Sequence, residues 1–338
     1  MRFFDGAAVD AALGYPALVD ILEAAFIRGA IAPLRHHHAI ALDGRPEATL
    51  LLMPAWEESA PGSALAGSHL GVKCVTVFPD NAARAKPAVF GTYLLLSAET
   101  GETLAVMDAT RLTAWRTGAA SALASRHLSR PDASRLLMVG AGALAPFLVR
   151  AHSCVRPIRE VAVWNRSRGR AEALIAELAG YGIQAAVADD LEAAVRRADI
   201  VSTATLAIKP LIRGAWLAPG THLDCVGAFK PGMRETDDEV VRRARIFADT
   251  RAGAFGEAGD ILQPLNAGVI GRDAVLGDLF DLTRGTVAGR HSDQDITLFK
   301  SVGAAIEDLA ADLTPLAADF VHRGDRPTYH PGRLAVDG

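Results

Sequence analysis

Residues 135–145, RLLMVGAGALA, have the types and spacing to bind the pyrophosphate of a dinucleotide. A short apolar strand leads into the pattern GxGxxA, whose glycines let the backbone turn tightly and approach the phosphates. The pyrophosphate then rests on the amide groups at the start of the next helix. A glycine-rich turn that binds nothing is the alternative, since the motif alone is weak. We predict cofactor contacts from four residues of the turn: Gly140, Gly142, Ala143 and Leu144.

The second strand of this unit ends without the acid that is typical of NAD enzymes. About 20 residues past such a turn, Asp or Glu usually binds the ribose 2′-hydroxyl. Here residues 161–168, VAVWNRSR, place Asn165, Arg166 and Ser167 in that region. We predict that these side chains contact a 2′-phosphate, so that NADP(H) is preferred. NAD(H) stays possible, because an arginine at this position can also stack on adenine.

The elements that must position this site follow in the order of a doubly wound α/β sheet. Buried apolar runs alternate with helical segments. The expected helices are 171–178 and 191–197, and the expected strands are 184–187, 199–205, 222–228 and 246–249. In such sheets, ligands bind at the carboxyl ends of the strands. We therefore expect further cofactor contacts from Thr203, Ala204, Thr205, Val226 and Gly227.

The chain before this unit is long enough to form a separate α+β region that handles a substrate. Helical spacing predicts a helix around residues 18–26, and alternation predicts strands at 48–53 and 72–78. Two apolar runs on either side of Gly101 predict a hairpin. We expect these strands to form one antiparallel sheet.

Two long helices are expected to join the regions. The first begins near Asp108 or Thr110, which are candidate N-caps, and ends before Pro131. The second is predicted over residues 295–309, DITLFKSVGAAIEDL, and returns to the first region. Residues 253–259 are interpreted as a loop.

Composition bounds the class of protein. The chain has 338 residues, of which 50% are hydrophobic and 22% charged, as in a soluble globular protein with two domains. A formal net charge of −4 without a basic block argues against nucleic acid as a partner. No signal peptide or membrane span is indicated, so we expect a cytoplasmic protein that does not bind membranes. Three cysteines without CxxC spacing indicate neither a disulfide framework nor a zinc site.

Several motifs together resemble the ornithine cyclodeaminase and mu-crystallin family. They are LLMPAW at 51–56, GVKCVTVFPDN at 71–81, ETGETLAVMDATRLTAWRTGAASALAS at 99–125, the nucleotide turn, and ITLFKSVGAAIEDL at 296–309. The resemblance implies a Rossmann-type domain joined to an α+β domain that binds substrate and forms a homodimer. We expect residues 1–117 and 296–338 in the α+β domain and 118–295 in the Rossmann domain. Family members include cyclodeaminases, alanine dehydrogenases and NAD(P)H-dependent ketimine reductases, so membership alone does not choose the reaction.

Three cations match the family's clamp for a substrate carboxylate: Arg35, Lys73 and Arg116. Arginine can hold a carboxylate with a planar fork, and lysine adds a point charge and a proton. Lys73 and Arg116 are the predicted catalytic residues. Lys73 interrupts an apolar run and must pair or face a cavity, unless it is simply exposed on an alternating strand. A surface salt bridge is the alternative for Arg116, and Arg45 competes with Arg35.

Other polar residues are ambiguous. His36, His37 and His38 cannot all converge on one ion, because adjacent strand residues alternate faces, so no metal is predicted. One of them could still line the substrate site. Ser301 matches a family position near cofactor and substrate, although packing alone would also explain it. We also expect Thr117 to contact the cofactor.

The chain departs from the cyclodeaminase pattern in residues 224–239, DCVGAFKPGMRETDDE. Cyclodeaminases carry an aspartate two residues after the motif glycine, and here Phe229 stands there. An aromatic ring cannot pair with a second ammonium group. We interpret Phe229 as part of an apolar wall around a ring, and neither Asp224 nor Asp237 and Asp238 is an obvious substitute.

These features most resemble the branch of the family that reduces Δ1-pyrroline-2-carboxylate to L-proline and Δ1-piperideine-2-carboxylate to L-pipecolate. The expected partner is therefore a small cyclic imino acid. The alternatives are ornithine cyclodeaminase or alanine dehydrogenase activity, or a mu-crystallin-like protein that binds NADPH without useful turnover.

Overall fold

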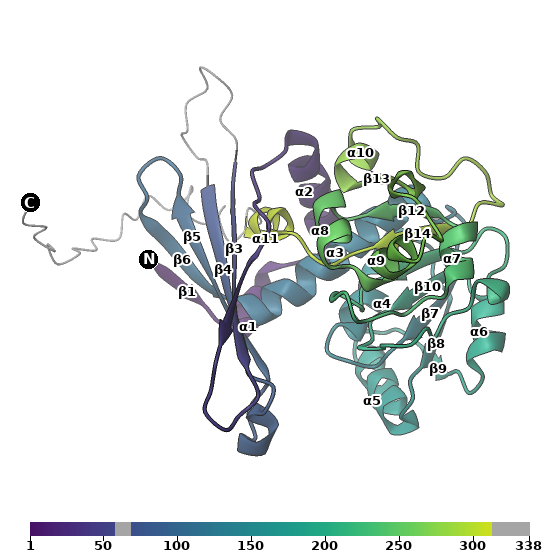
Figure 1. Ribbon diagram of the computed structural model, residues 1–338, viewed down its shortest axis with the longest axis horizontal. Coiled ribbons are helices and arrows are strands. Elements are labelled where there is room, and N and C mark those ends of the chain that lie inside the picture. Colours follow the sequence, from purple (N-terminus) through teal and green to yellow (C-terminus); the bar gives the residue numbers. More distant parts are fainter. Residues whose placement is uncertain (58–68, 313–338) are drawn as a thin grey trace, which may run out of the picture.

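Two β-sheets, joined by a long helix, organise the chain (Figure 1). The computed structural model describes residues 1–57 and 69–312. The predicted segment 296–338 therefore lies outside the described residues from 313 onward. In the described part, no helix has both the length and the apolar character needed to cross a bilayer.

The first sheet has the order β1-β6-β5-β4-β3-β2. Its strands are β1 (Arg2–Phe4), β2 (His36–Ile40), β3 (Ala48–Trp56), β4 (His69–Val77), β5 (Val89–Ser97) and β6 (Thr103–Asp108). The predicted hairpin is present as β5 and β6, with Gly101 in a left-handed conformation (φ 73°) between them. The sheet is antiparallel except at its edge, where β1 runs parallel to β6.

Helices cover one face of this sheet. They are α1 (Gly6–Ala12), α2 (Tyr15–Arg28), α3 (Ala109–Leu128) and α11 (Ala305–Asp312). Leu18, Leu22 and Phe26 of α2 are fully buried, as their helical spacing predicts, and they share a core with Tyr93 and Leu95 of β5. Helix α3 begins where Asp108 accepts a hydrogen bond from the amide of Arg111, so one of the two predicted caps is used.

The second sheet is parallel and has the order β13-β12-β14-β11-β10-β7-β8-β9. Its strands are β7 (Arg135–Val139), β8 (Glu160–Trp164), β9 (Ala185–Val187), β10 (Ile200–Thr203), β11 (His222–Cys225), β12 (Arg245–Ala248), β13 (Val275–Asp278) and β14 (Thr297–Lys300). The helices around it are α4 (Ala145–Val155), α5 (Arg168–Ala179), α6 (Leu191–Arg197), α7 (Asp238–Arg243), α8 (Arg251–Glu257), α9 (Gly259–Asn266) and α10 (Leu279–Thr283). The predicted doubly wound α/β architecture is confirmed.

The predicted helix over 295–309 is wrong. Its first part is the strand β14, which pairs with β11 on one side and β12 on the other, and only its second part is helical. Every residue of β14 is buried, and an apolar run enclosed in this way has no exposed side that distinguishes a strand from a helix. The chain therefore leaves the second sheet only after Lys300. Residues 253–259, interpreted as a loop, contain most of α8.

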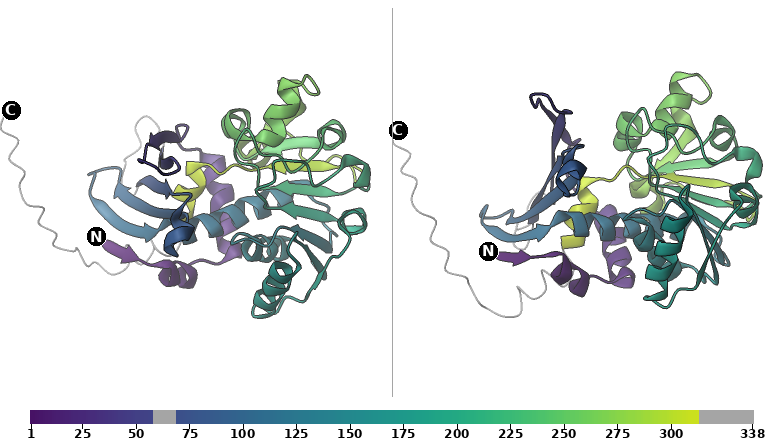
Figure 2. Two further views of the ribbon diagram at one scale, coloured as in Figure 1. Left: turned by 60° about the horizontal axis from the view of Figure 1, so that its bottom comes forward. Right: turned by 90° about the horizontal axis from the view of Figure 1, so that it is seen from below.

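Helix α3 runs from the first sheet to the second in every view (Figures 1 and 2). It packs against α2, α11 and α4. Its run of small residues allows this close approach: a Cβ added to Gly118 would lie 2.6 Å from the Tyr15 hydroxyl and 3.1 Å from the Phe147 carbonyl. Substrate and nucleotide regions are therefore held by one shared helix.

A buried polar network fastens α3 to the second sheet. The carboxylate of Asp224 accepts from Ser121 of α3 (2.9 Å) and Ser202 of β10 (2.7 Å), and lies 3.0 Å from Nε2 of His152. Burial opposes ionisation of Asp224, yet the hydrogen bonds from His152 and Ser202 lower the pKa of this carboxyl. Asp224 thus belongs to the fold and does not replace the aspartate of cyclodeaminases.

His222 sits beside this network and must be neutral. Thr297 donates its hydroxyl proton to the Leu128 carbonyl (2.9 Å), so Nδ1 of His222 donates to the Thr297 oxygen (2.9 Å). A second ring proton would have no acceptor, because Nε2 is buried without a partner among the described residues. Burial accordingly lowers the pKa of His222 to about 3.

We expect His222→Asn to reduce the loss of stability in acid. The pKa of His222 is lower in the folded state, so stability is lost as pH falls from about 6.5 towards 3, with a limiting slope of about 1.4 kcal/mol per pH unit. Asparagine keeps the donor to Thr297 and cannot be protonated. Urea unfolding between pH 4 and 7 measures this slope, and the same change at the exposed His37 is the control. An unchanged slope would contradict a neutral buried histidine.

Candidate functional site

The predicted nucleotide turn joins β7 to α4 at the carboxyl edge of the second sheet. Gly140 has a φ of 108°, and a Cβ at this position would lie 2.7 Å from the carbonyl oxygen of Ala204. Gly142 faces open space. Ala143 and Leu144 complete the turn, and α4 begins without a side-chain cap, which leaves amide groups free for an anion. The residues present therefore fit a dinucleotide pyrophosphate.

The side chains after β8 differ in whether they bind other described residues. Asn165 accepts from the amide of Ala141 (3.3 Å) and donates to the carbonyl of Ser167 (2.9 Å), so it braces the turn. Arg168 pairs with Glu172 and Asp189. Arg166 is exposed and has no hydrogen bond or ion pair with any described residue. Of these groups, Arg166 is the cation that remains available to a phosphate.

Glu235, which sequence reasoning missed, binds the residues at the end of β10. Thr203 donates its hydroxyl to the Glu235 carboxylate (2.9 Å), and Thr205 donates both its amide (2.7 Å) and its hydroxyl (2.8 Å). The two predicted threonines are therefore turned towards a buried acid. Burial raises the pKa of Glu235 to about 7, although the charge of Lys300 opposes this shift.

The remaining predicted cofactor residues lie at or near the same edge. Val226 and Gly227 directly follow β11, and both are buried. Thr117 is buried on α3, the helix against which α4 packs. No contact with a cofactor tests these positions, so their roles stay predictions.

Lys73 and Arg116, far apart in sequence, meet at one carboxylate. Nζ of Lys73 lies 2.7 and 2.9 Å from the two carboxylate oxygens of Asp308, and Nε of Arg116 lies 3.0 Å from one of them. Lys73 is 2% exposed and Arg116 is 5% exposed, so neither is a surface cation. Burial and the neighbouring Arg116 charge lower the pKa of Lys73 to about 8.

Arg116 also contacts a second acid of α11. Its Nη1 donates to Glu307 (2.5 Å), and burial raises the pKa of Glu307 to about 7 although Arg116 opposes the shift. The other oxygen of Glu307 is buried and has no partner in the described part of the chain. Nη2 of Arg116 likewise has no hydrogen-bond partner among the described residues and faces Gly303, where a Cβ would lie 2.8 Å away. With a φ of 84°, Gly303 is required at this position.

Arg35 reaches the same turn from the loop before β2. It donates to the carbonyls of Val302 (2.8 Å) and Gly303 (2.7 Å) and pairs with Glu257 (3.1 Å). Its charge also contributes to the lowered pKa of Lys73. The competing Arg45 instead binds Asp80 at 2.7 and 2.9 Å. The structure therefore brings Arg35, and not Arg45, to the predicted cation cluster.

Ser301 is held by an acid that the sequence analysis did not single out. Asp249 follows β12 and accepts from the Ser301 hydroxyl (3.1 Å) and from the amides of Val302 (2.7 Å) and Gly303 (2.6 Å). Asp249 is buried, and so are the three residues that it binds directly after β14. Asp249 thus shapes the turn that Arg35 and Arg116 contact.

Phe229 and the histidines are placed differently. Phe229 is 38% exposed and follows Ala228, which has a φ of 50°. His36, His37 and His38 lie on the exposed strand β2, where His37 is 3.4 Å from Glu257. Within residues 1–57 and 69–312, no group of His, Cys, Asp and Glu is arranged to hold a metal.

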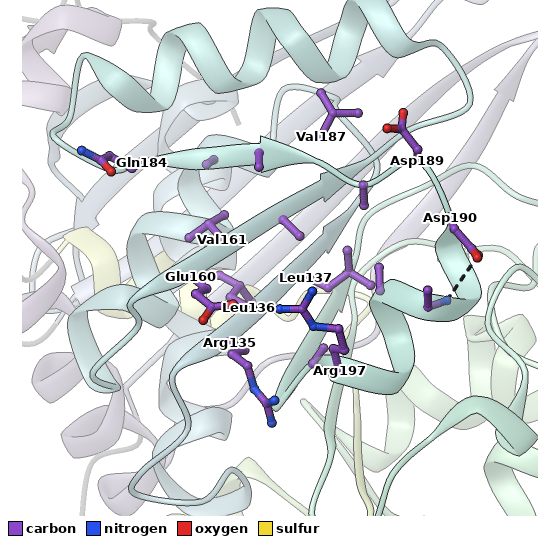
Figure 3. Close-up of a pocket in the computed structure, with 17 residues that line it drawn as sticks. Arg135, Leu136, Leu137, Glu160, Val161, Gln184, Val187, Asp189, Asp190 and Arg197 are labelled. Atoms are coloured by element: carbon purple, nitrogen blue, oxygen red, sulfur yellow. Dashed lines mark hydrogen bonds and ion pairs between the residues drawn. The ribbon is translucent and has the colours of Figure 1, made fainter.

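Two cavities lie near these elements. A pocket of about 240 Å³ beside the cluster is lined by Arg35, Glu257, Gly303 and Phe280, among others. A larger groove of about 550 Å³ lies between α6 and strands β7 to β9 (Figure 3). This groove runs from Arg135 and Glu160, at the amino ends of β7 and β8, to Asp189 and Asp190 beyond β9, and its lining includes neither the nucleotide turn nor the cation cluster. The smaller pocket is therefore the one that belongs to the site.

Comparisons with known proteins agree with this arrangement. A Δ1-pyrroline-2-carboxylate reductase of Paracoccus denitrificans is 42% identical over 290 residues, which are 83% of this chain and 89% of that protein. The structure of the Thermococcus litoralis Δ1-pyrroline-2-carboxylate reductase with NADH and L-proline matches with a TM-score of 0.84 and 31% identity, over 92% of this chain and 95% of that chain.

An archaeal alanine dehydrogenase dimer with bound NAD matches with a TM-score of 0.81 and 31% identity, over 92% of this chain. It covers the same two-sheet architecture, and its own chain is covered to 93%. The family model for ornithine cyclodeaminase and mu-crystallin matches residues 6–314. The predicted resemblance is thus confirmed, and the chain belongs to the ornithine cyclodeaminase/mu-crystallin family.

Proposed function

We propose that this protein reduces the C=N bond of cyclic 2-imino acids with a nicotinamide cofactor. The substrates would be Δ1-pyrroline-2-carboxylate and Δ1-piperideine-2-carboxylate, and the products L-proline and L-pipecolate. The observation that carries the proposal is the meeting of Lys73 and Arg116 beside the end of β14, on the edge that also holds the dinucleotide turn. The reductase relatives in Paracoccus and Thermococcus support the same reaction.

The charges of the cluster suit a zwitterion. Lys73 and Arg116 provide positive charge for a carboxylate, and Arg116 keeps Nη2 free of other partners within the described residues. Glu307 and Asp308 provide negative charge for a protonated imine, and one oxygen of Glu307 lacks a donor. A cyclic iminium carboxylate carries a positive ring nitrogen and, on the neighbouring ring carbon, a carboxylate, so it matches such a paired site.

The chain's residues position the substrate and hold its proton. The cofactor, when bound, supplies the hydride. Lys73 can give and take a proton at Nζ near neutral pH, because its pKa is lowered to about 8. Arg116 would orient the carboxylate, and Phe229 would border the ring. The two rings differ by one methylene, worth about 0.8 kcal/mol when buried, so both should be accepted.

Ornithine cyclisation is disfavoured by the residues around β11. Phe229 cannot pair with a second ammonium group. Asp224 is committed to Ser121, Ser202 and His152, and Asp237 caps α7. No acid in this segment replaces the missing one.

A spectrophotometric assay with NADPH or NADH and Δ1-pyrroline-2-carboxylate tests the proposed reaction. We expect turnover by the wild type, and a fall in kcat/KM of about tenfold to hundredfold in Lys73→Ala and Arg116→Ala, because a charge-assisted contact contributes about 1.5–3 kcal/mol. Cofactor affinity, measured by fluorescence titration, should stay close to wild type.

Arg45→Ala is the matched control, because Arg45 binds Asp80 away from the cluster. Its kinetic constants should equal those of the wild type. No turnover with either cofactor would refute the proposed reaction. Turnover with pyruvate and ammonia in place of the cyclic imine would assign an alanine dehydrogenase.

We also propose that NADPH is preferred over NADH, because Arg166 is exposed and pairs with no described residue, and because residues 165–168 contain no acid. Arg166→Ala should then lower the ratio of kcat/KM for NADPH to that for NADH, while Arg170→Ala, a nearby exposed arginine, should not. An unchanged ratio in Arg166→Ala would assign the 2′-phosphate to another group.

A homodimer is proposed through the free face of the first sheet. Alternate strand residues face the helices, so their neighbours face outward, and one outward row contains Pro54, Val72, Leu94 and Val106. Phe3, paired with Val106, is 75% exposed. Such a continuous apolar row is typical of an interface. Light scattering should give twice the chain mass for the wild type and the single chain mass for Leu94→Glu, and a monomeric wild type would contradict the dimer.

A further inference from the structure

Three charged side chains are buried together behind the carboxyl edge of the second sheet. Lys300 ends β14, Asp260 lies in α9, and Glu235 lies in the loop between β11 and α7, and each is fully buried. None of them belongs to the proposed substrate cluster. Burying three charges is costly, and apolar residues of similar size often stabilise a core equally well. The arrangement therefore calls for a role beyond packing.

The cluster forms a continuous chain of contacts. Nζ of Lys300 donates to the carbonyl of Gly227 and lies 3.3 Å from Asp260. Asp260 accepts from the amides of Glu235 and Thr236, each at 2.9 Å. The backbone that carries Glu235 is thereby anchored to α9 and, through Lys300, to β14.

The side chain of Glu235 in turn binds the residues at the end of the neighbouring strand, β10. Its carboxylate receives three hydrogen bonds from Thr203 and Thr205, as described above. The fit leaves no spare room, since a Cβ on Gly227 would lie 2.4 Å from Glu235 and 2.3 Å from the Thr205 carbonyl. The ends of β10, β11 and β14 are therefore held against one another by side chains of this cluster.

We propose that Glu235 is a positioning residue for hydride transfer, with Lys300 and Asp260 holding it in place. It fixes the strand ends on which the nicotinamide side of the cofactor would rest, and Gly227 leads directly to Phe229. Rates of group transfer depend steeply on alignment, and a displacement of about 1 Å can cost about a hundredfold. This inference rests on the proposed reductase function and assigns Glu235 no contact with the substrate.

The first test uses the cofactor-free protein and needs no activity. Hydrogen exchange measured by mass spectrometry reports the amide of Thr205, which donates to Glu235. Glu235→Gln should raise exchange in the peptide that spans residues 203–209, because a neutral amide accepts less strongly from the Thr205 amide than a carboxylate and replaces the oxygen that binds Thr203 by an NH₂ group. Asp237→Asn, which weakens the cap of α7 in the same loop, should leave that peptide unchanged.

The second test compares kinetics of the same proteins with the imine substrate. Glu235→Gln should lower kcat by about tenfold or more and raise the deuterium isotope effect from labelled NADPH, with little change in the KM of the imine. Asp260→Asn should act in the same direction, because it acts through Glu235. Asp237→Asn should match the wild type in both quantities.

The outcomes separate the two proposals. An inactive wild type would refute the reductase function. The exchange measurement needs no activity, so it would still test whether Glu235 holds the backbone after β10. If Glu235→Gln keeps the kcat, the isotope effect and the exchange rate of the wild type, the positioning role is wrong. Equal losses in Glu235→Gln and Asp237→Asn would also overturn it, since they would reflect stability only. If Glu235→Gln does not fold, Asp260→Asn is judged by the same criteria.

Discussion

The site depends on Asp308, a buried carboxylate shared by two cations. Lys73 arrives from β4, Arg116 from α3 and Asp308 from α11, so one acid ties a sheet and two helices together. Each charge is removed from water, and each is tolerable only while the others are present. Losing one partner of such a buried pair commonly costs about 3–5 kcal/mol. For this reason, the proposed substrate cluster also holds α3 and α11 against β4 of the first sheet.

A second constraint is the use of buried acids to shape backbone at the edge of the parallel sheet. Asp249 accepts hydrogen bonds from the amides that follow β14, and Glu235 accepts hydrogen bonds from groups that follow β10. Both acids accept from backbone amides, which secures loops whose groups have no partner within a strand or helix. The turns at this edge of the sheet can then stay rigid although they lie outside regular structure.

Sequence reasoning succeeded where the physical signal is local. The glycine turn needs a positive φ at Gly140, helix α3 begins at the capping Asp108, and the hairpin turns at Gly101. It failed for β14, because a fully buried strand has no polar side to reveal its period. It also missed Glu235 and Asp249, since an acid in a polar loop looks the same whether it is exposed or buried.

The sequence by itself determined the family, the parallel sheet with its dinucleotide turn, and the cations Lys73 and Arg116, and the structure then chose Arg35 over Arg45. Those features are encoded in short motifs whose order along the chain is enough to recognise them. Only the tertiary structure decided which acids neutralise the cations. Lys73 and Asp308 are 235 positions apart, and Arg116 and Glu307 are 191 apart. Partners at such separations are chosen by the packing of whole helices and strands, and no local pattern records that choice.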